Sequence, residues 1–371
     1  MKKIFFLFGT RPEAIKMIPL IKACEQQPDK WQTYICVTGQ HRQMLAQVLD
    51  FFGVTPHEDL ALMKPGQTLF DITADGLKRL DEVLEREKPD VLVVQGDTTS
   101  AFTGALAAYY KKIKIAHIEA GLRSGNKYSP FPEEMNRKMT GNLADFHFAP
   151  TVNSQQNLYA ENIHEHVYVT GNTVIDALLM TADIIKDATA YKEYFSFLDP
   201  SKRTILVTGH RRESFGQPFE EICMAIRDIA LRYEGKVQIV YPVHLNPQVQ
   251  EPVQRLLTGV PGVHLIEPLD YPYLVWLMKQ SYLVLTDSGG IQEEAPALGK
   301  PVLVMRDVTE RTEGIDAGTA RLVGTSRKAI VENCFALMDD EQLYQQMAQA
   351  VNPYGDGTSS TQIIDILHKV L

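Results

Sequence analysis

The sequence predicts an α/β protein with two doubly wound domains, each built on a parallel sheet, and a cleft between the domains. Short β-rich runs alternate with longer helical patterns throughout the 371 residues, as in parallel sheets that helices cover on both faces. The alternation forms two series, and the chain is longer than one typical domain. Ligands of such sheets bind at the carboxyl ends of the strands, where we therefore look for functional residues.

The expected elements follow in order along the chain. Strands of the first series cover 4–8, 33–37, 91–95, 113–118, 146–149 and 167–170, with helices such as 13–26, 68–87 and 99–111 between them. Strands of the second series cover 204–208, 237–241, 263–266, 282–285 and 302–305, with a helix over 219–233. A helix over 174–187 and the polar stretch 191–202 mark the boundary, so we expect domains at 1–172 and 173–357. A last helix over 358–371 follows, with a serine cap at Ser359 or Ser360.

The composition is that of an ordinary globular protein, with 44% hydrophobic and 22% charged residues. A net charge of −9 argues against nucleic acid or an anionic membrane as the main partner. The apolar run over 4–8 is too short for a signal peptide, and no run has the length of a membrane span. The four cysteines have no metal or redox spacing, so we interpret them as reduced thiols of a cytoplasmic protein: Cys24, Cys36, Cys223 and Cys334.

The stretch 282–301 carries the strongest local signal. An apolar strand is followed by the residues TDSGG and then by a short helical pattern. A turn of this kind places free backbone N–H groups at the positive end of a helix and favours phosphate; it is formed here by Ser288, Gly289 and Gly290. Glu293 and Glu294, one turn further on, can accept hydrogen bonds from sugar hydroxyls. The pattern indicates a site for a nucleotide diphosphate, and an ordinary strand–helix turn with exposed acids is the alternative.

Basic residues follow three other expected strands. Arg11 and Lys16 lie near the start of the first helix, where a cation weakens the helix unless an anion is present, so we expect a phosphate contact. The loop after the first strand of the second series carries His210, which could act as a base or donate to a phosphate, beside Arg211. Arg311, after a later strand, could hold a ribose or a phosphate. Basic or structural residues without a ligand are the alternative in each case.

Carboxylates follow neighbouring strands of the first series. Asp97 and Glu119 come after the apolar strands 91–95 and 113–118, and Glu133 and Glu134 begin a helix. Such groups at one sheet edge would repel one another and suit general acid and base catalysis. The alternative for each is a helix N-cap or a first-turn acid. The sequence contains no metal-binding cluster, dinucleotide-binding glycine pattern, Walker motif or Gly-x-Ser-x-Gly elbow, so we expect neither a metal nor a cofactor.

The motifs occur together in one order: GTRPE at 9–13, QGDT at 95–98, HIEAGLR at 117–123, PEEMNR at 132–137, TGHRRE at 208–213 and TDSGGIQEE at 286–294. With them, the chain resembles the bacterial non-hydrolysing UDP-N-acetylglucosamine 2-epimerases from about residue 3 to its C-terminus. The resemblance implies the GT-B architecture, with two Rossmann-like domains, an interdomain cleft and a last helix that packs back on the first domain. It also implies a homodimer.

The resemblance implies that UDP-N-acetylglucosamine and UDP-N-acetylmannosamine are interconverted by elimination of UDP across carbons 1 and 2 of the sugar. The intermediate is 2-acetamidoglucal, and UDP then adds back with a proton on the other face of carbon 2. No redox cofactor takes part, and the product would feed surface polysaccharide synthesis. The implied catalytic residues are Asp97, Glu119 and Glu133, as acid and base with their faces unassigned, and His210, on the leaving diphosphate. The implied substrate-binding residues are Arg11, Lys16, Ser288, Gly289, Gly290, Glu294 and Arg311.

Members of the resembled family can also bind a second UDP-N-acetylglucosamine as an allosteric activator. The positions that would contribute here are Gln40, His41, Gln67, Glu134, Arg211 and His244, and surface polar residues without a ligand are the alternative. Two departures from the family pattern, Leu269 and Leu274, stand where some relatives have Gln and Phe, beside the uracil.

Three other functions compete with this interpretation. A hydrolysing epimerase would release free N-acetylmannosamine together with UDP. A GT-B glycosyltransferase would use the same UDP site with a separate acceptor, although three strand-end carboxylates exceed the single base that a transferase usually needs. A nucleotide-sugar sensor would bind without turnover, and Asp97 and Glu119 would then be dispensable for binding.

Overall fold

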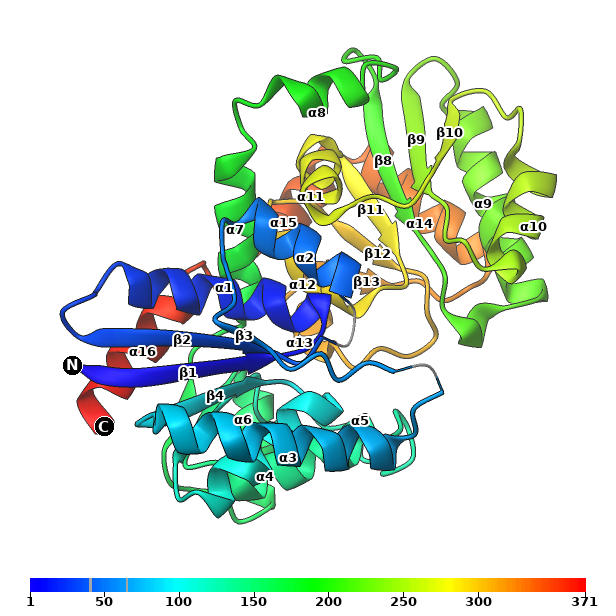
Figure 1. Cartoon of the computed structure of the whole chain (residues 1–371). Coiled ribbons are helices and arrows are strands. Elements are labelled where there is room, and N and C mark those ends of the chain that lie inside the picture. Colours follow the sequence, from blue (N-terminus) through cyan, green and yellow to red (C-terminus); the bar gives the residue numbers. More distant parts are fainter. Residues whose placement is uncertain (40–41, 65) are drawn as a thin grey trace. The chain divides into compact units, whose positions relative to one another are not determined.

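The computed structural model describes residues 1–39, 42–64 and 66–371. Contacts between residues divide the chain into two compact units, which we describe separately. Unit 1 consists of Met1–Ala177 together with Tyr354–Leu371, and unit 2 consists of Leu178–Pro353. Each unit contains one sheet, in which neighbouring strands are parallel (Figure 1). The two parallel sheets confirm the fold class that the alternating pattern predicts.

Unit 1 has a seven-stranded sheet in the order β3-β2-β1-β4-β5-β6-β7. Its strands are β1 (Lys2–Phe8), β2 (Trp31–Val37), β3 (Glu58–Asp59), β4 (Val91–Gln95), β5 (Lys114–Ile118), β6 (Phe146–Ala149) and β7 (Val167–Val169). Its helices are α1 (Arg11–Glu25), α2 (Arg42–Phe51), α3 (Leu69–Glu87), α4 (Thr99–Tyr110), α5 (Glu133–Leu143), α6 (Val152–Ala160) and α16 (Ser359–Val370), while α7 (Thr173–Ile184) continues into unit 2. The edge strand β3 was not predicted, because two residues are too few to show an apolar pattern.

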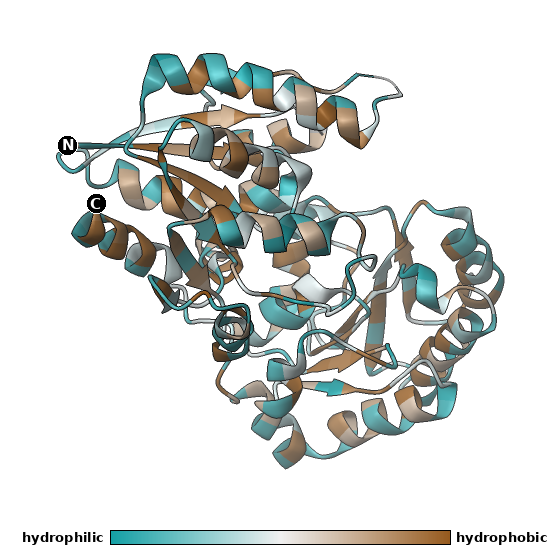
Figure 2. Ribbon diagram, turned by 90° about the horizontal axis from the view of Figure 1, so that it is seen from below, coloured by the Kyte–Doolittle hydropathy of each residue, from teal (hydrophilic) through white to brown (hydrophobic). Residues whose placement is uncertain are grey.

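Burial on both faces explains why β1 is a continuous apolar run. Residues 4–8 have no exposed surface. Phe5 and Leu7 pack with residues of α3 and α4, such as Leu80 and Ala105, and the alternate residues point to the opposite face. Figure 1 shows α1 on the other side of the sheet from α3 and α4, and Figure 2 shows apolar strands between helices of mixed hydropathy. Polar side chains are therefore confined to the strand ends.

Unit 2 has a six-stranded sheet in the order β10-β9-β8-β11-β12-β13. Its strands are β8 (Arg203–Thr208), β9 (Val237–Pro242), β10 (Val263–Ile266), β11 (Leu283–Thr286), β12 (Val302–Val304) and β13 (Ala320–Leu322). Its helices are α8 (Thr189–Tyr194), the 3-10 turn η1 (Arg212–Ser214), α9 (Gln217–Arg232), α10 (Pro247–Leu257), α11 (Tyr271–Gln280), α12 (Gly289–Ala297), α13 (Thr312–Asp316), α14 (Arg327–Asp339) and α15 (Glu341–Ala348). Val207 and Leu285 belong to a core with α9 and α14, whereas Leu206 and Val284 belong to a core with α11 and α12.

The start of α16 corrects one prediction. Its N-cap is Thr358, which makes no side-chain cap hydrogen bond, and Ser359 and Ser360 lie in the first turn. Asp176 of α7 accepts the backbone N–H of Ser360 at 2.7 Å. A carboxylate from another helix therefore satisfies a donor that a serine cap would otherwise serve. Helix α16 packs against α1 within unit 1.

The four cysteines are buried, free thiols, as the sequence predicts. Burial raises the pKa of each thiol, which keeps the sulfur protonated and unreactive. Among the described residues, helices that are both long and apolar enough to cross a membrane are absent.

Two histidines of unit 1 are buried side by side, since His117 of β5 is paired with His147 of β6. Burial lowers the pKa of His117 to about 3 and that of His147 to about 4, from an ordinary value of 6.5. An unfolded chain takes up both protons near pH 6.5, whereas the folded chain does so only near pH 3 to 4. The free energy of unfolding therefore falls as the pH is lowered through this window.

We predict that replacing His147 with Phe makes this loss of stability on acidification shallower. Each buried neutral histidine contributes a slope of about 1.4 kcal/mol per pH unit within the window, and the variant lacks one of the two. Urea unfolding at several pH values between about 6 and 4.5 measures the slope. His164→Gln, at an exposed histidine of the same unit, is the control. An identical slope in His147→Phe and the unsubstituted protein would contradict the prediction.

Candidate active site

The candidate residues lie where the strand order of each sheet changes direction. In unit 1 the chain runs from β1 outward to β2 and β3, and then returns to β4 on the other side of β1. In unit 2 the same change occurs between β8 and β11. Loops after such neighbouring strands diverge and leave space for a ligand. Arg11 and Asp97 follow β1 and β4, while His210 and Ser288 follow β8 and β11.

A buried carboxylate, Glu13, holds the loop after β1. Its Oε2 accepts the backbone N–H groups of Gly9 at 3.0 Å and Thr10 at 2.8 Å. Its Oε1 accepts the hydroxyl of Thr98 at 2.6 Å, which joins this loop to the one that carries Asp97. Burial raises the pKa of Glu13, and these hydrogen bonds oppose the shift. The sequence shows this capping box as Thr-x-x-Glu, so it was predictable.

The first residue of α1 is Arg11. Within the described residues, its guanidinium has neither a carboxylate partner nor a hydrogen-bond acceptor, which keeps the charge available to an anion. Lys16, one turn further along the helix, instead contacts Glu119. The structure therefore separates the two cations that the sequence associates with one phosphate.

Asp97 and Glu119 share a cationic neighbour. The guanidinium of Arg137 contacts Asp97, and its Nη2 lies 3.9 Å from Glu119 Oε1. Glu119 Oε2 contacts Lys16 and accepts the side-chain N–H of Gln95 at 3.0 Å. Positive charge between and beside the carboxylates offsets the repulsion that their positions at adjacent strand ends imply. The structure thus brings Asp97 and Glu119 together, as the sequence predicts.

Glu119 has little conformational freedom. Its side chain is buried, and its φ of +61° lies in the left-handed region that residues other than glycine rarely adopt. Asn172, at the start of the segment that leads into α7, donates its side-chain N–H to Glu119 Oε2 at 3.4 Å. This carboxylate is held from three directions, which suits a group that must meet one atom of a ligand.

Helix α5 contributes two further carboxylates. Glu133 lies one turn before Arg137 on the same helix face. The Oε2 atom of Glu133 is buried and has no hydrogen-bond partner among the described residues. Glu134 instead accepts the backbone N–H groups of Ser124 at 2.9 Å and Gly125 at 3.3 Å, so it anchors a loop.

In unit 2, the loop after β8 is bound to the end of β11. Asp287 is wholly buried, and its Oδ2 accepts the backbone N–H groups of His210 at 2.6 Å and Arg211 at 2.8 Å. The His210 ring stacks on His244, with ring centroids 5.1 Å apart. Burial lowers the pKa of His210; Asp287 opposes this effect, and His244 and Arg211 add to it.

The start of α12 differs from the predicted turn. Gly289 and Gly290 are its first two helical residues, and neither has a positive φ. A Cβ at Gly289 would lie 3.2 Å from Glu310 Oε1, so a larger residue there would require the Glu310 side chain to move by a few tenths of an ångström. Guanidinium atoms of Arg311 and Arg211 lie 3.7 Å and 3.8 Å from the same point. The N–H groups of this helix N-terminus and the two cations favour a phosphate, whereas the Glu310 carboxylate, the nearest group to this point, disfavours one.

The two carboxylates of α12 are buried, which contradicts the exposed acids of the alternative interpretation. Arg311 Nε donates to Glu293 Oε1 at 2.6 Å. The hydroxyl of Tyr271, from α11, donates to Glu294 Oε1 at 2.7 Å. Burial raises the pKa of Tyr271 well above its usual value, so the hydroxyl keeps the proton that it donates. Leu269 and Leu274, the two departures from the family pattern, pack against the core that includes α11 and α12.

The residues matched to an activator site have separate surroundings. Gln40 and His41 lie outside the described residues. Gln67 donates to the carbonyl of Leu62 at 2.6 Å and so stabilises its own loop. Glu134 anchors the loop of Ser124 in unit 1, whereas Arg211 and His244 belong to unit 2. The activator site stays a prediction.

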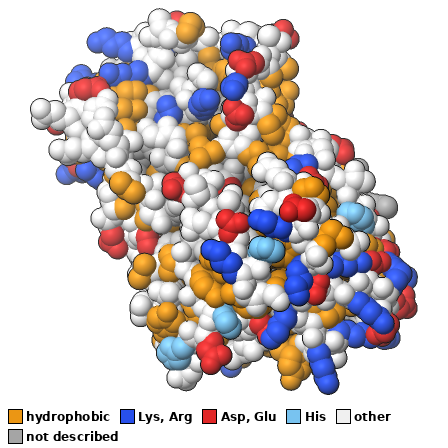
Figure 3. Space-filling view, turned by 90° about the vertical axis from the view of Figure 1, so that its left-hand side faces the viewer, with side chains coloured by type: hydrophobic (Ala, Val, Ile, Leu, Met, Phe, Trp, Pro, Cys, Tyr) orange, Lys and Arg blue, Asp and Glu red, His pale blue; other side chains and the backbone are white. Residues whose placement is uncertain are grey.

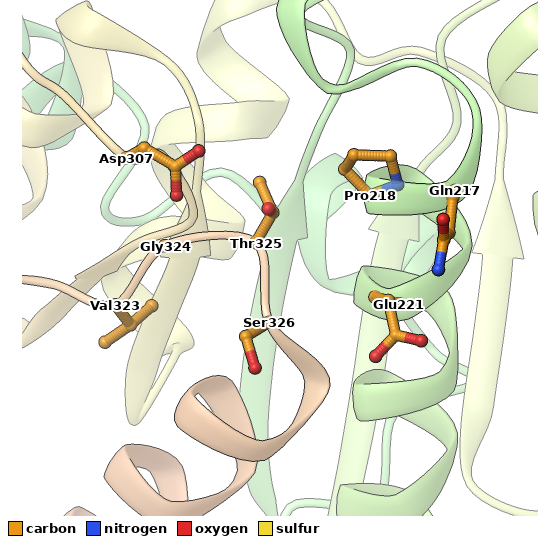
Figure 4. Close-up of a pocket in the computed structure, with 8 residues that line it drawn as sticks. All are labelled: Gln217, Pro218, Glu221, Asp307, Val323, Gly324, Thr325 and Ser326. Carbon is orange, nitrogen blue, oxygen red and sulfur yellow. The ribbon is translucent and has the colours of Figure 1, made fainter.

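An open hollow of about 510 Å³ lies in unit 2 between the start of α9 and the loops after β12 and β13 (Figure 4). Its lining includes Asp307 and Glu221 and none of the predicted site residues. On the face shown in Figure 3, basic and acidic side chains are interspersed. The part of the chain that the structure describes contains no group of three or more His, Cys, Asp or Glu residues that could hold a metal ion.

Three residues of the site were not predicted as such. Arg137 could have been found, because it lies four residues after Glu133 in a helical pattern. Asp287 could also have been found, since it directly follows a buried strand, as Asp97 nearly does. Tyr271 gave no signal, because its contact with Glu294 joins two helices that are distant in sequence.

The two parallel sheets, with charged residues at the point where each strand order reverses, define a protein of the GT-B class. A sequence model of the UDP-N-acetylglucosamine 2-epimerase family matches residues 22–368. The chain is 55% identical to the UDP-N-acetylglucosamine 2-epimerase of Salmonella typhimurium, over 98% of both chains. We conclude that the chain belongs to the UDP-N-acetylglucosamine 2-epimerase family.

Solved structures agree with this assignment. The crystal structure of UDP-GlcNAc 2-epimerase from Neisseria meningitidis bound to UDP-GlcNAc has a TM-score of 0.90 at 47% identity, covering 99% of this chain and 100% of that one. The enzyme from Methanocaldococcus jannaschii, in complex with UDP-GlcNAc and UDP, has a TM-score of 0.80 at 32% identity, covering 99% of each chain.

We predict that Tyr271→Phe destabilises the protein by about 1–3 kcal/mol, because it leaves the buried Glu294 carboxylate without the hydroxyl donor at 2.7 Å. Urea unfolding at pH 7 measures the change. Tyr273→Phe is the matched control on the same helix, because no hydrogen bond of the Tyr273 hydroxyl is seen among the described residues. Equal stabilities of the two variants would refute this account of Tyr271.

Proposed function

We propose that this protein is a non-hydrolysing UDP-N-acetylglucosamine 2-epimerase, an isomerase that interconverts UDP-N-acetylglucosamine and UDP-N-acetylmannosamine. The observation that carries the proposal is the cluster of Asp97, Glu119 and Arg137 at adjacent strand ends, in a chain of this family. Binding of UDP-GlcNAc and UDP by the Neisseria and Methanocaldococcus relatives supports the choice of substrate.

The chemistry has to avoid direct deprotonation of carbon 2, because neither of its ring neighbours is a carbonyl. We propose elimination instead. A base removes the proton from carbon 2, the bond from carbon 1 to the UDP oxygen breaks, and 2-acetamidoglucal forms beside UDP. UDP then adds back to carbon 1 while an acid delivers a proton to the opposite face of carbon 2. Atoms balance without an oxidant, a reductant or water.

Unit 1 would supply the acid and the base. Asp97, Glu119 and Glu133 are the candidates, as the two faces of carbon 2 require at least two proton-transfer groups. Compensating charge from Lys16 and Arg137 allows carboxylates to stay close together. The Oε2 atom of Glu133, which lacks a partner among the described residues, is available to a substrate proton.

Unit 2 would hold the nucleotide. The N–H groups at the start of α12, beside Ser288, Gly289 and Gly290, together with nearby Arg311, favour the diphosphate. Glu294, which is buried and accepts the Tyr271 hydroxyl at 2.7 Å, would accept the ribose hydroxyls. His210 and, from unit 1, Arg11 would compensate the charge that develops on the departing UDP.

Further features of the family resemblance belong to the same proposal. They are a homodimer, a second UDP-N-acetylglucosamine as allosteric activator, a cytoplasmic location and a product that feeds surface polysaccharide synthesis. Activation would appear as faster consumption of UDP-N-acetylmannosamine when a trace of UDP-N-acetylglucosamine is added.

We predict that the protein, incubated with UDP-N-acetylglucosamine in deuterated water without added metal or NAD, forms UDP-N-acetylmannosamine. NMR of the sugar should show deuterium at carbon 2, because the removed proton exchanges with solvent before one is returned. Free N-acetylmannosamine would assign the protein to the hydrolysing enzymes instead. Unchanged substrate would favour a transferase or a sensor.

We also predict that Asp97→Asn and Glu119→Gln each lower turnover by about 10²–10⁴-fold, the usual contribution of a general acid or base. Circular dichroism and UDP binding should stay close to those of the unsubstituted protein. Asp29→Asn, at an exposed carboxylate of the same unit, is the matched control and should keep full turnover. Full turnover in both active-site variants would remove the two carboxylates from the mechanism.

A further inference from the structure

Asp287 occupies an unusual position for a carboxylate. It directly follows β11, and its side chain has no exposed surface. Thr286 of β11 is paired with Thr208 of β8, and the backbone N–H of Asp287 donates to the carbonyl of Thr208 at 3.1 Å. The residue therefore lies beside the first turn of the loop that carries His210.

One oxygen of Asp287 organises that loop. Oδ2 accepts the backbone N–H groups of His210 at 2.6 Å and of Arg211 at 2.8 Å. Two hydrogen bonds from consecutive N–H groups fix the direction in which the chain leaves β8, and they offset the cost of burying the carboxylate. This arrangement fixes the backbone position from which the His210 side chain extends.

The other oxygen faces the His210 ring. Oδ1 is buried and has no hydrogen-bond partner among the described residues. It lies 3.7 Å from His210 Nδ1, just beyond the range of about 2.7–3.2 Å for an N–H···O hydrogen bond. A proton on Nδ1 would be attracted to this carboxylate oxygen and would donate to it after a small movement of the ring, and it would leave Nε2 of the neutral ring as an acceptor that points elsewhere.

We propose that Asp287 is a positioning residue for His210, which holds its loop and selects the ring form that carries the proton on Nδ1. When a second proton binds, Nε2 becomes a donor while Nδ1 stays directed at Asp287. A histidine held in this way can donate to an anion, such as the diphosphate of the proposed substrate, without turning its ring.

The other groups around His210 oppose a charge on its ring. His244 stacks on it at an interplanar angle of 11°, and Arg211 is its neighbour in the loop. Both lower the pKa of His210, as burial does, whereas Asp287 is the group that raises it. Asp287 thus compensates a positive charge that its other neighbours disfavour.

The test is Asp287→Asn in the full-length protein. The amide oxygen can still accept the two backbone N–H groups. The amide NH₂ would face Nδ1, so Nδ1 would have to be the unprotonated, accepting nitrogen. Nitrogen-15 NMR of labelled histidine, with the His210 signals assigned by comparison with His210→Gln, reports the ring form. We expect the proton on Nδ1 in the unsubstituted protein and on Nε2 in Asp287→Asn. A proton on Nε2 in the unsubstituted protein, or the same form in both, would overturn the inference.

The pH dependence of activity gives a second measurement, which rests on the proposed function. Loss of the negative charge should lower the pKa of His210 further, so the fall in kcat/KM on the alkaline side starts at lower pH, and kcat/KM there is lower in Asp287→Asn than in the unsubstituted protein. Asp307→Asn, at an exposed carboxylate after the neighbouring strand β12, is the matched control and should leave both readouts unchanged.

The two proposals can fail separately. Absence of epimerisation by the unsubstituted protein would refute the proposed function while the NMR result still decides the role of Asp287. Normal epimerisation with an unshifted pH profile in Asp287→Asn would refute the role of Asp287 alone. If Asp287→Asn does not fold, the ring form in the unsubstituted protein decides the question by itself.

Discussion

Compensation of buried carboxylates is the constraint on which the site in both units depends. Because helices cover both faces of each sheet, the strands are apolar and acids are placed at their ends, where they are partly or wholly buried. An acid in such a place must be given donors or positive charge. Arg137 and Lys16 do this for Asp97 and Glu119, and Arg311 does it for Glu293. The loops take the paths that bring these partners together.

Most of the fold could be predicted from the sequence, because burial on two faces produces continuous apolar runs that are easy to recognise. The strand 4–8 is an example, since each of its residues is in a core. The edge strands β3 and β13 could not be predicted, because Glu58–Asp59 and Ala320–Leu322 contain charged residues and no continuous apolar run. The prediction of a serine cap for α16 was wrong because the group that accepts the N–H of Ser360 is Asp176, which is 184 residues away in sequence.

The candidate site was predictable where a residue follows directly from a strand or lies at helical spacing. Asp97, Glu119 and His210 were found in this way. Partners that act across elements were not, and Tyr271 against Glu294 is the clearest case. The glycines before Glu293 were predicted in a turn, whereas they begin helix α12 with no positive φ, and a Cβ at Gly289 would lie 3.2 Å from Glu310 Oε1. Local patterns thus identify candidate residues, and tertiary contacts determine how each is held.

The hydrogen bond between Asp176 and Ser360 can form only late in the synthesis of the chain. Unit 1 is assembled from two segments of the chain, and all of unit 2 lies between them. Residues 354–371 leave the ribosome only after unit 2 has been made, so helix α16 cannot dock on α1 until late in translation. Unit 2 is one contiguous segment. Its synthesis begins after most of unit 1 has been made, and it ends before residues 354–371 are made. The nascent chain therefore carries an incomplete first unit, with the surface of α1 that α16 covers still open to solvent, throughout the synthesis of the second.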